Sequence, residues 1–368
     1  MRRKNALSVP NNRGFSLMEA LVSLIVVSIV LAGATALFLQ NQKVSTAQVS
    51  LATMRTSLRA AMATIGHDLR SVGAFMRSSG VTAYSGNTEF GLRLLECNNI
   101  NPSDPSNHIG GYTGYSANLP DRIRVIEPDL AKNTTLYDSY QRNTNDFKSV
   151  KIRPDDFLIG DILIITNANV TDDPTLWTSD LFEVTNNQSV GGSNPFSILH
   201  FANNAPSGLN GPLGFGDHAY PPGSAVFRVR VWEYYVDLSD PTIPKLYRRE
   251  FNRALELVAE YIEDLQVALG LDTNGDDNIS DTEWVNTSFT AITDAQLHTL
   301  RAVRVTLVAR TGYVPVEMAG KRAGTYDIYY RQPDVEDHQP DNETELPRYR
   351  EVYEEVIYLR NLRPDRNS

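Results

Sequence analysis

One stretch near the N-terminus decides the class of this protein. Residues 13–39 read RGFSLMEALVSLIVVSIVLAGATALFL. The part from Ala20 to Leu39 is a run of 20 residues without a charge, and about 20 apolar residues in a helix span the hydrocarbon core of a bilayer. Glu19 stands directly before this run. Because a carboxylate at that depth is costly and usually has a partner, the stretch predicts a membrane-spanning helix whose acid needs a partner.

The residues before this run predict its orientation. Residues 1–14 contain four basic side chains and no acid, and basic flanks stay on the cytoplasmic side. We therefore expect a single-pass protein whose body lies outside the cytoplasm. A secretory signal peptide is the simpler alternative, but it has a shorter apolar run followed by a small-residue cleavage site. A plain membrane anchor is another, but it leaves Glu19 unexplained.

The residues around Gly14 resemble the type III signal of type IV prepilins and type II secretion pseudopilins. In these families Gly precedes Phe, and an acid occupies the fifth position of an apolar run, as Gly14, Phe15 and Glu19 do here. The resemblance implies that prepilin peptidase cuts between Gly14 and Phe15 and methylates the new amino group of Phe15. It also implies that Glu19 pairs with the N-terminal amine of a neighbouring subunit. The chain would then sit in the inner membrane with a periplasmic head before it enters a pilus at the cell surface.

The predicted helix continues beyond the membrane to about residue 73. Apolar residues recur at spacings of three and four, which indicates an amphipathic helix; a long coiled coil is the alternative. This apolar stripe consists of Val44, Ala47, Leu51, Met54, Leu58, Ala61, Ile65, Leu69, Val72 and Met76. The expected organisation is a leader at 1–14, a transmembrane half-helix at 15–40, an amphipathic half-helix at 41–76 and a globular head at 77–368.

Composition restricts the ligands of the head. The chain has 368 residues and a formal net charge of −10, and removal of the leader with its four basic residues would leave −14. Because binding to nucleic acid needs clustered Lys and Arg, we expect no nucleic acid as a ligand. Cys97 is the single cysteine, which excludes an intrachain disulfide and a cysteine-based zinc site. We expect it to be a buried, inert thiol.

Strand signals dominate after about residue 119. Apolar and polar residues nearly alternate in 225–236 and in 302–309, as in antiparallel strands with one covered face. The helix stripe is the natural cover, so we expect an α+β fold of the type IV pilin kind. A further helix is expected at Arg253–Gln266, whose apolar residues would share one face. The expected strands are Arg122–Glu127, Phe157–Thr166, Leu181–Thr185, Ser197–Phe201, Ala225–Val236, Lys245–Glu250, Ala302–Thr311 and Glu351–Arg360.

Four segments resemble PilW-type minor pilins more closely. They are the end of the long helix at 67–73, and then Ala259–Val267, Arg301–Leu307 and the closing Tyr358–Leu362. The closing segment also resembles that of the large minor pseudopilins. The resemblance implies a subunit of pilus assembly, and a head of this size suits a filament tip better than a regular helical filament.

Residues 272–283, DTNGDDNISDTE, match a calcium loop at most positions. In an EF-hand loop, side-chain oxygens lie at positions 1, 3 and 5, a backbone carbonyl at 7 and a bidentate acid at 12. Position 6 requires a positive φ and is Asp277 instead of Gly. We expect Ca2+ here, with a solvated acidic turn as the alternative. The ligands would be Asp272, Asn274, Asp276, Asn278 and Glu283.

No catalytic motif accompanies these features. The six histidines are scattered, and the sequence has no Gly-x-Ser-x-Gly, HExxH or Walker motif. For His218, which follows Asp217, we expect a place in a surface loop. We therefore expect no enzyme and no catalytic residues.

The predicted function is that of a minor pilin that takes part in initiating type IV pilus assembly, in a complex at the filament tip. The expected partners are other minor pilins, the major pilin, prepilin peptidase, the inner membrane and a tip adhesin. One alternative is a minor pseudopilin of a type II secretion system, which shares the leader and the closing motif. The other is a membrane-anchored extracytoplasmic binding protein.

Overall fold

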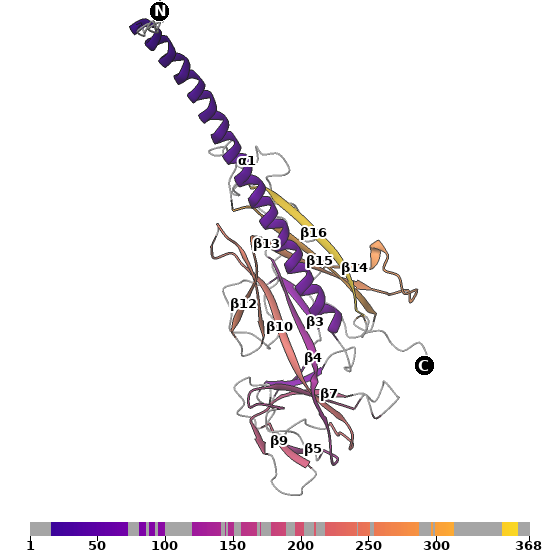
Figure 1. Cartoon of the computed structure of the whole chain (residues 1–368). Coiled ribbons are helices and arrows are strands. Elements are labelled where there is room, and N and C mark those ends of the chain that lie inside the picture. Colours follow the sequence, from indigo (N-terminus) through magenta and orange to yellow (C-terminus); the bar gives the residue numbers. More distant parts are fainter. Residues whose placement is uncertain are drawn as a thin grey trace, which may run out of the picture. The chain divides into compact units, whose positions relative to one another are not determined.

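The computed structural model comprises two compact units, residues 1–52 and 53–368, and the helix α1, Leu17–Ser71, runs through both (Figure 1). The structure describes residues 16–72, 81–85, 88–92, 95–99, 120–140, 144, 146–150, 156–167, 170, 178–188, 196–201, 210, 218–240, 242–250, 254–286, 296, 299–312 and 348–359.

In the first unit α1 is an apolar helix with almost all of its side chains exposed. Its polar side chains are satisfied within the helix: Ser23 Oγ donates to the Glu19 carbonyl at 2.7 Å, and Thr35 Oγ1 donates to the Leu31 carbonyl at 2.8 Å. Ser28 makes the same bond. Because lipid offers no hydrogen bonds, such local bonds make polar residues tolerable in a membrane helix. Among the described helices, α1 is long and apolar enough to cross a membrane.

In the second unit α1 buries one face. Met54, Leu58, Ala61, Ile65 and Leu69 are each at most 2% exposed, and their spacing of three and four residues is the predicted stripe. The expectation of an amphipathic half that packs on a β-rich head is therefore confirmed from residue 54 onward. The earlier members of the stripe are not buried, since Val44 is exposed, and Met76 lies outside the described residues.

A sheet of nine strands forms the largest part of the second unit (Figure 1). Two long strands, β4 and β10, lie side by side, and Val125 pairs with Trp232 in their antiparallel ladder. The pairings of the sheet are antiparallel except for β1 with β7. Its strands are β1 Val81–Ser85, β2 Thr88–Leu92, β3 Leu95–Asn99, β4 Asp121–Thr135, β6 Ile162–Thr166, β7 Ser179–Glu183, β10 Ala225–Asp237, β11 Lys245–Glu250 and β12 Leu255–Glu260.

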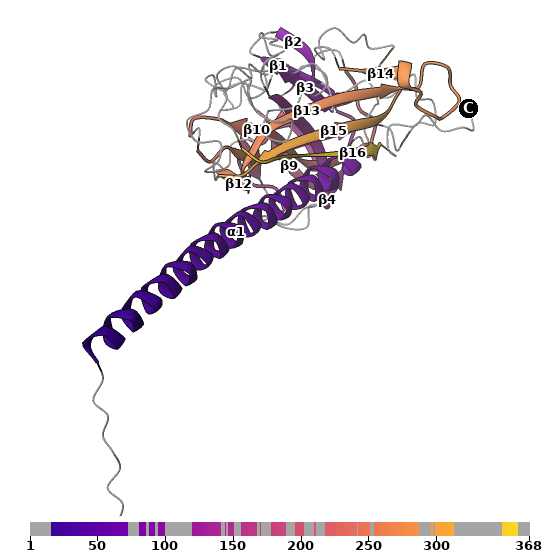
Figure 2. The same cartoon turned by 90° about the horizontal axis from the view of Figure 1, so that it is seen from above.

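A second, four-stranded sheet has the order β14-β13-β15-β16 and is antiparallel throughout. Its strands β13, β15 and β16 lie side by side in Figure 2. Their bounds are β13 Ile262–Leu271, β14 Trp284–Val285, β15 Leu300–Arg310 and β16 Arg350–Tyr358. A third sheet, β5-β9-β8, consists of Asp146–Val150, Phe196–His200 and Asn186–Gln188.

The third sheet belongs to a separate aromatic core. Phe147, Phe182 and Phe201 meet with ring centroids 5.1 to 5.8 Å apart, which is the usual separation of aromatic pairs. Tyr140 and Tyr220 join the same buried cluster, which is completed by Leu136, Phe157, Leu163, Ile165, Val184, Leu199 and Val226. This end of the second unit therefore has its own apolar centre, apart from the face covered by α1.

The expected helix at 253–266 is wrong. Residues 255–260 and 262–271 form β12 and β13, and every residue of β13 is buried. A strand buried on both faces lacks the alternation that marks a half-exposed strand, so its apolar residues also fitted a helical period. Long-range pairing with β15 decides the outcome, because such tertiary contacts override local propensity.

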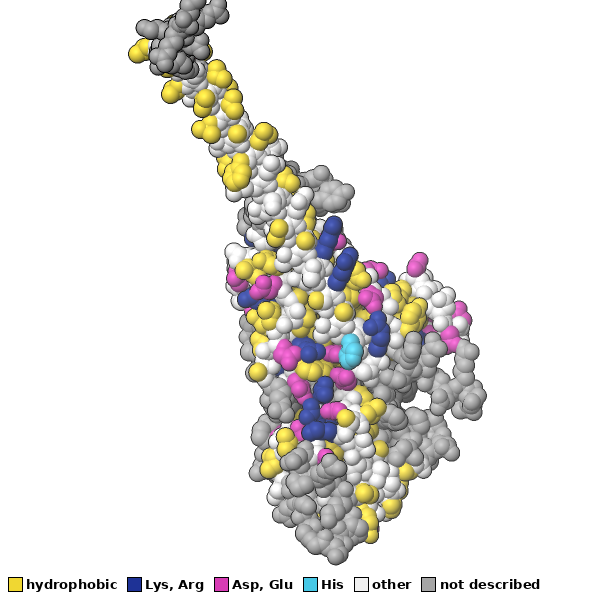
Figure 3. Space-filling model, viewed as in Figure 1, with side chains coloured by type: hydrophobic (Ala, Val, Ile, Leu, Met, Phe, Trp, Pro, Cys, Tyr) yellow, Lys and Arg dark blue, Asp and Glu magenta, His cyan; other side chains and the backbone are white. Residues whose placement is uncertain are grey.

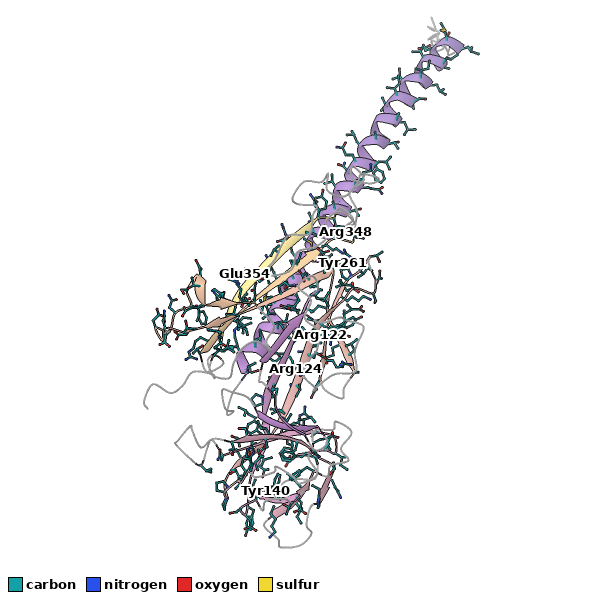
Figure 4. The ribbon with its side chains drawn as sticks, turned by 180° about the vertical axis from the view of Figure 1, so that it is seen from behind. Arg122, Arg124, Tyr140, Tyr261, Arg348 and Glu354 are labelled. Carbon is teal, nitrogen blue, oxygen red and sulfur yellow. The ribbon has the colours of Figure 1, made fainter. Side chains whose placement is uncertain are left out.

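The chain passes from one sheet to the next at Tyr261, which has a φ of 67° and is labelled in Figure 4. A positive φ is a genuine outlier for a bulky residue. Tyr261 is held on both sides: its N–H donates to the Pro244 carbonyl at 2.6 Å, and its carbonyl accepts from the Arg310 N–H at 2.9 Å. Its ring also packs on Gly312, where a β-carbon would lie 2.8 Å from the Tyr261 ring.

The eight expected strands are all present, and seven of them have shifted ends. The prediction for Lys245–Glu250 matches β11 at both ends. The strand expected at 157–166 begins only at Ile162, because Gly160, with a φ of 89°, turns the chain just before it. Cys97 lies in β3, and the burial of its side chain is outside what the structure describes.

An acid joins α1 to the nine-stranded sheet. Asp68 is only 3% exposed; its carboxylate accepts a hydrogen bond from the Tyr234 hydroxyl on β10 and lies 3.4 Å from the Arg248 guanidinium on β11. Burial raises the pKa of Tyr234, and the Asp68 carboxylate raises it further, so the tyrosine keeps its proton and acts as the donor. Arg248 also stacks 4.2 Å from the Trp232 ring.

The same site affects Glu127 on β4. Its carboxylate accepts a hydrogen bond of 3.0 Å from Trp232 Nε1. Burial raises the pKa of Glu127, and the nearby Asp68 carboxylate raises it further. Asp68 therefore acts on three strands of the sheet from one helix position.

Replacing Asp68 with Ala should destabilise the second unit by about 1–3 kcal/mol, because it leaves the buried Tyr234 hydroxyl without its acceptor. Tyr234→Phe should cost about 1–3 kcal/mol, since it removes one buried hydrogen bond to a charged group. Thermal unfolding of the detergent-purified chain by circular dichroism measures both. Asp138→Ala, at an exposed aspartate, is the matched control. If Asp68→Ala has the same melting temperature as Asp138→Ala, the role assigned to Asp68 is wrong.

Replacing Gly312 with Ala should lower the melting temperature, because the new methyl group overlaps the ring of Tyr261 and overpacking costs about 1–3 kcal/mol. The Tyr261→Gly change should relieve this clash, so the double variant should lose less than the sum of the two single losses. Gly33→Ala is the control, since nothing lies within 4 Å of a β-carbon there. Additive losses in the double variant would refute the contact.

Candidate functional site

The predicted processing site lies outside the described residues, because Gly14 and Phe15 precede them. Glu19 is described and lies in the first turn of α1. It is exposed among exposed apolar side chains, with Leu17 at 83% and Leu21 at 51%. Within the described part of the chain its carboxylate has no ion pair or hydrogen bond. The partial positive charge at a helix N-terminus favours an acid there, but it does not replace a partner.

The predicted calcium loop follows β13 directly and includes the short 3-10 helix at Asp281–Glu283. The Asp272 carboxylate accepts hydrogen bonds from the N–H groups of Gly275, Asp276 and Asp277 at 2.8 to 3.2 Å. Asp277 has a φ of 63°, so the positive φ expected at position 6 is confirmed even though the residue is not Gly. The backbone of the loop thus turns around its first acid.

Glu283 closes the loop from the other end. One carboxylate oxygen accepts from the Thr273 N–H and hydroxyl, both at 2.9 Å, and from the Asn274 N–H at 3.3 Å. The other accepts from the Ser280 N–H and hydroxyl, both at 2.9 Å. These hydrogen bonds, those from Ser280 first, lower the pKa of Glu283 to about 2. Glu283 is therefore ionised, and its hydrogen bonds connect the two ends of the loop.

This geometry fits a cation only in part. A carboxylate has about four acceptor sites, and Glu283 already accepts five hydrogen bonds, which leaves no free pair of oxygens for a bidentate ligand. Asp272 also lies 3.7 Å from the guanidinium of Arg301. In the described ranges, no three or more His, Cys, Asp or Glu side chains converge on one point as a metal site. Asn274 and Asp276 stay exposed and bond to each other at 3.1 Å.

One polar cluster had no signal in the sequence. His218, expected in a surface loop, is partly buried, and its Nδ1 lies 2.9 Å from the carboxylate of Asp180. Asp180 is fully buried and also accepts a hydrogen bond from the Tyr220 hydroxyl. These residues meet only through the fold, so no local motif announces them.

Two family models match the chain. Residues 233–361 match the type IV pilus-assembly protein W model, PilW, and residues 9–35 match the prokaryotic N-terminal methylation motif. The first match spans β10 to β16 with Tyr261, the calcium-like loop and Arg248, and the second spans Gly14, Phe15 and Glu19. No curated protein matches. Among solved structures, the type IV-like pilin TTHA1219 from Thermus thermophilus is similar at 10% identity, with a TM-score of 0.31, over 84% of this chain and 97% of that one.

The family matches agree with the order of the elements. A methylation motif leads into an apolar helix that fits a membrane-anchored pilin, and a β-rich head carries the PilW segment. Pilin-like proteins of this kind are structural. Residues 233–361 are therefore similar to the type IV pilus-assembly protein W and residues 9–35 to the prepilin methylation motif, and together these two matches support a role as a minor pilin in type IV pilus assembly.

Proposed function

We propose that this minor pilin joins other minor pilins in a complex that initiates the type IV pilus and stays at its tip. In this proposal prepilin peptidase removes residues 1–14 on the cytoplasmic side of the inner membrane and methylates Phe15. The head then lies in the periplasm until the subunit enters the pilus, where the major pilin and a tip adhesin are its further partners. The chain acts through these contacts and not as an enzyme.

Glu19 carries this proposal. It is an acid in an apolar, exposed helix, and it has no partner in the described chain. A buried or lipid-exposed charge is tolerated when an opposite charge neutralises it. The amine of Phe15 on a neighbouring subunit would supply that charge, which makes assembly the step that satisfies Glu19.

Replacing Glu19 with Gln should abolish incorporation into pili without preventing removal of the leader. The amide keeps the size of the side chain and loses its charge, so only the ion pair is removed. Incorporation is measured by immunoblotting sheared pili, and leader removal by the intact mass of the membrane-bound chain. Retention of Glu19→Gln in pili at the wild-type level would disprove the role of the acid.

Gly14→Val tests whether leader removal is required for assembly. This variant should keep its leader and should also fail to enter pili, whereas Gly33→Ala, within α1, should behave as wild type. Removal of the leader in a strain without prepilin peptidase would refute the prepilin assignment itself.

We propose Ca2+ as a ligand of the loop 272–283. The spacing of Asp272, Asn274 and Asp276 and the positive φ of Asp277 support it. Glu283 opposes binding, because it must lose its hydrogen bonds from Thr273, Asn274 and Ser280 before it can coordinate the ion. Binding of this kind would add stability by mass action, because the unfolded loop has no preformed site.

Calcium should raise the melting temperature relative to EGTA, and Glu283→Gln should remove this difference. Thr282→Val, whose hydroxyl faces Ser280 at 3.2 Å, is the control within the loop. An equal melting temperature in calcium and EGTA would rule out the ion. In either medium the stabilising effect of ionised Glu283 should be full above about pH 4.5 and be lost as the pH falls toward 2, because folding lowers its pKa from 4.5 to about 2.

A further inference from the structure

The face of the four-stranded sheet that points away from α1 has the composition of a docking surface. On β16, Glu351 and Glu355 pair with Arg55 and Arg70 of α1 at 2.8 and 2.7 Å. Side chains alternate along a strand, so the intervening residues point the other way. We call this the outer face; it consists of Val352, Glu354, Val356 and Tyr358 on β16, with Arg304 on β15 and Trp284 on β14.

The outer face is apolar and exposed along its edge strand. Val352 is 44%, Val356 37% and Tyr358 49% exposed, although all three lie in the middle or end of a regular ladder. Beside them Arg304 stacks 4.7 Å from the Trp284 ring and lies 4.0 Å from Glu354, and Figure 4 labels Glu354 on this strand. Tyr, Trp and Arg are the residues enriched at binding hot spots.

The rim of this face is acidic. Asp281 precedes Trp284 by three residues, and Asp276 lies in the same loop; both are exposed. Tyr358 lies at the loop end of β16, because it pairs with Ala302, and the neighbouring Arg301 contacts Asp272 of the loop. The side chain of Glu354 adds a further exposed acid, at 56%. A negatively charged rim repels phosphate groups, so it disfavours nucleic acid and anionic lipid as ligands. It favours a partner with exposed arginine or lysine side chains.

The opposite side of the same unit carries the complementary charge. The exposed charged residues of α1 in the second unit are Arg55, Arg59, His67 and Arg70, and its single acid there, Asp68, is buried. Lys and Arg side chains follow this part of α1 in Figure 3. Arg59 has no partner in the described chain, and the ion pairs of Arg55 and Arg70 are exposed and therefore weak. Residues 73–368, in contrast, carry a formal charge of −16, since residues 1–14 contribute +4 and residues 15–72 contribute +2 to the total of −10.

We propose that the outer face binds the basic α1 face of a second pilin-type subunit. The contact joins two different surfaces, so it is heterologous, and repeated contacts of this type build open helical assemblies and not closed dimers. Val356 and Tyr358 supply the apolar centre, and Asp281 and Glu354 receive the arginines of the partner's helix. The proposal rests on the function proposed above and names the surface by which the head takes part in it.

The test places a photo-crosslinking residue, p-benzoylphenylalanine, at Tyr358 in cells that assemble the pilus. The expected product joins this position to a helix peptide of a second subunit that carries the N-terminal methylation motif, either another copy of this chain or another pilin, identified by mass spectrometry. The control is the same residue at Leu257 on β12, which is 50% exposed but lies in the other sheet. A yield at Tyr358 no higher than at Leu257 overturns the proposal, as does attachment to a protein without the motif or outside its helix.

Charge reversal tests the rim. Asp281→Lys and Glu354→Lys should each lower the crosslink yield at Tyr358 at least about threefold, because each replaces an attractive pair with a repulsive one. Glu260→Lys, an exposed acid on β12, should leave the yield unchanged. Equal yields in all three variants overturn the charge complementarity.

The two proposals fail differently. If the leader is removed and Glu19 is required for pili but no crosslink forms, the outer face alone is refuted. If the leader is not removed, both the proposed function and the outer-face contact are refuted.

Discussion

Asp68 is the residue on which the second unit depends. A buried carboxylate in a helix is stable only when its charge is compensated, and here the compensation comes from Tyr234 on β10 and Arg248 on β11. The apolar stripe would let α1 rotate or slide on the sheet, because apolar contact is not directional. The hydrogen bond from Tyr234 fixes which turn of the helix lies over which strand. Glu127 and Trp232 extend the same constraint to β4.

The second constraint is the positive φ of Tyr261, at the point where the chain leaves the nine-stranded sheet and enters the four-stranded sheet. The left-handed backbone at this position ends β12 and starts β13 in another direction. Both β12 and β13 are then paired elsewhere, with β11 and β15. The cost of a positive φ at a bulky residue is of order 1–3 kcal/mol, and the backbone hydrogen bonds to Pro244 and Arg310 hold it.

The sequence predicted the helix and the strands with alternating patterns, because a stripe such as Met54 to Leu69 and an alternation such as that of β10 are local signals. It failed at 253–266, where a strand buried on both faces carries no alternation. It located the loop at 272–283 and its positive φ at Asp277, but not that Glu283 is saturated by hydrogen bonds from Thr273, Asn274 and Ser280. It also missed Asp68 and Asp180. Their partners are distant in the sequence: Tyr234 and Arg248 for Asp68, and His218 and Tyr220 for Asp180.

Helix α1 contains only two acids, Glu19 and Asp68, and each needs a group that compensates its charge. Asp68 and Glu19 both sit in apolar stretches, and both need a compensating group. Asp68 finds its partners within the chain, so it stabilises the fold. Glu19 finds none in the described chain, and its neighbours are exposed apolar side chains, so the partner proposed for it is the Phe15 amine of another subunit. The same electrostatic cost therefore fixes one end of α1 to the nine-stranded sheet and, in the proposed assembly, favours a neighbouring subunit at the other end.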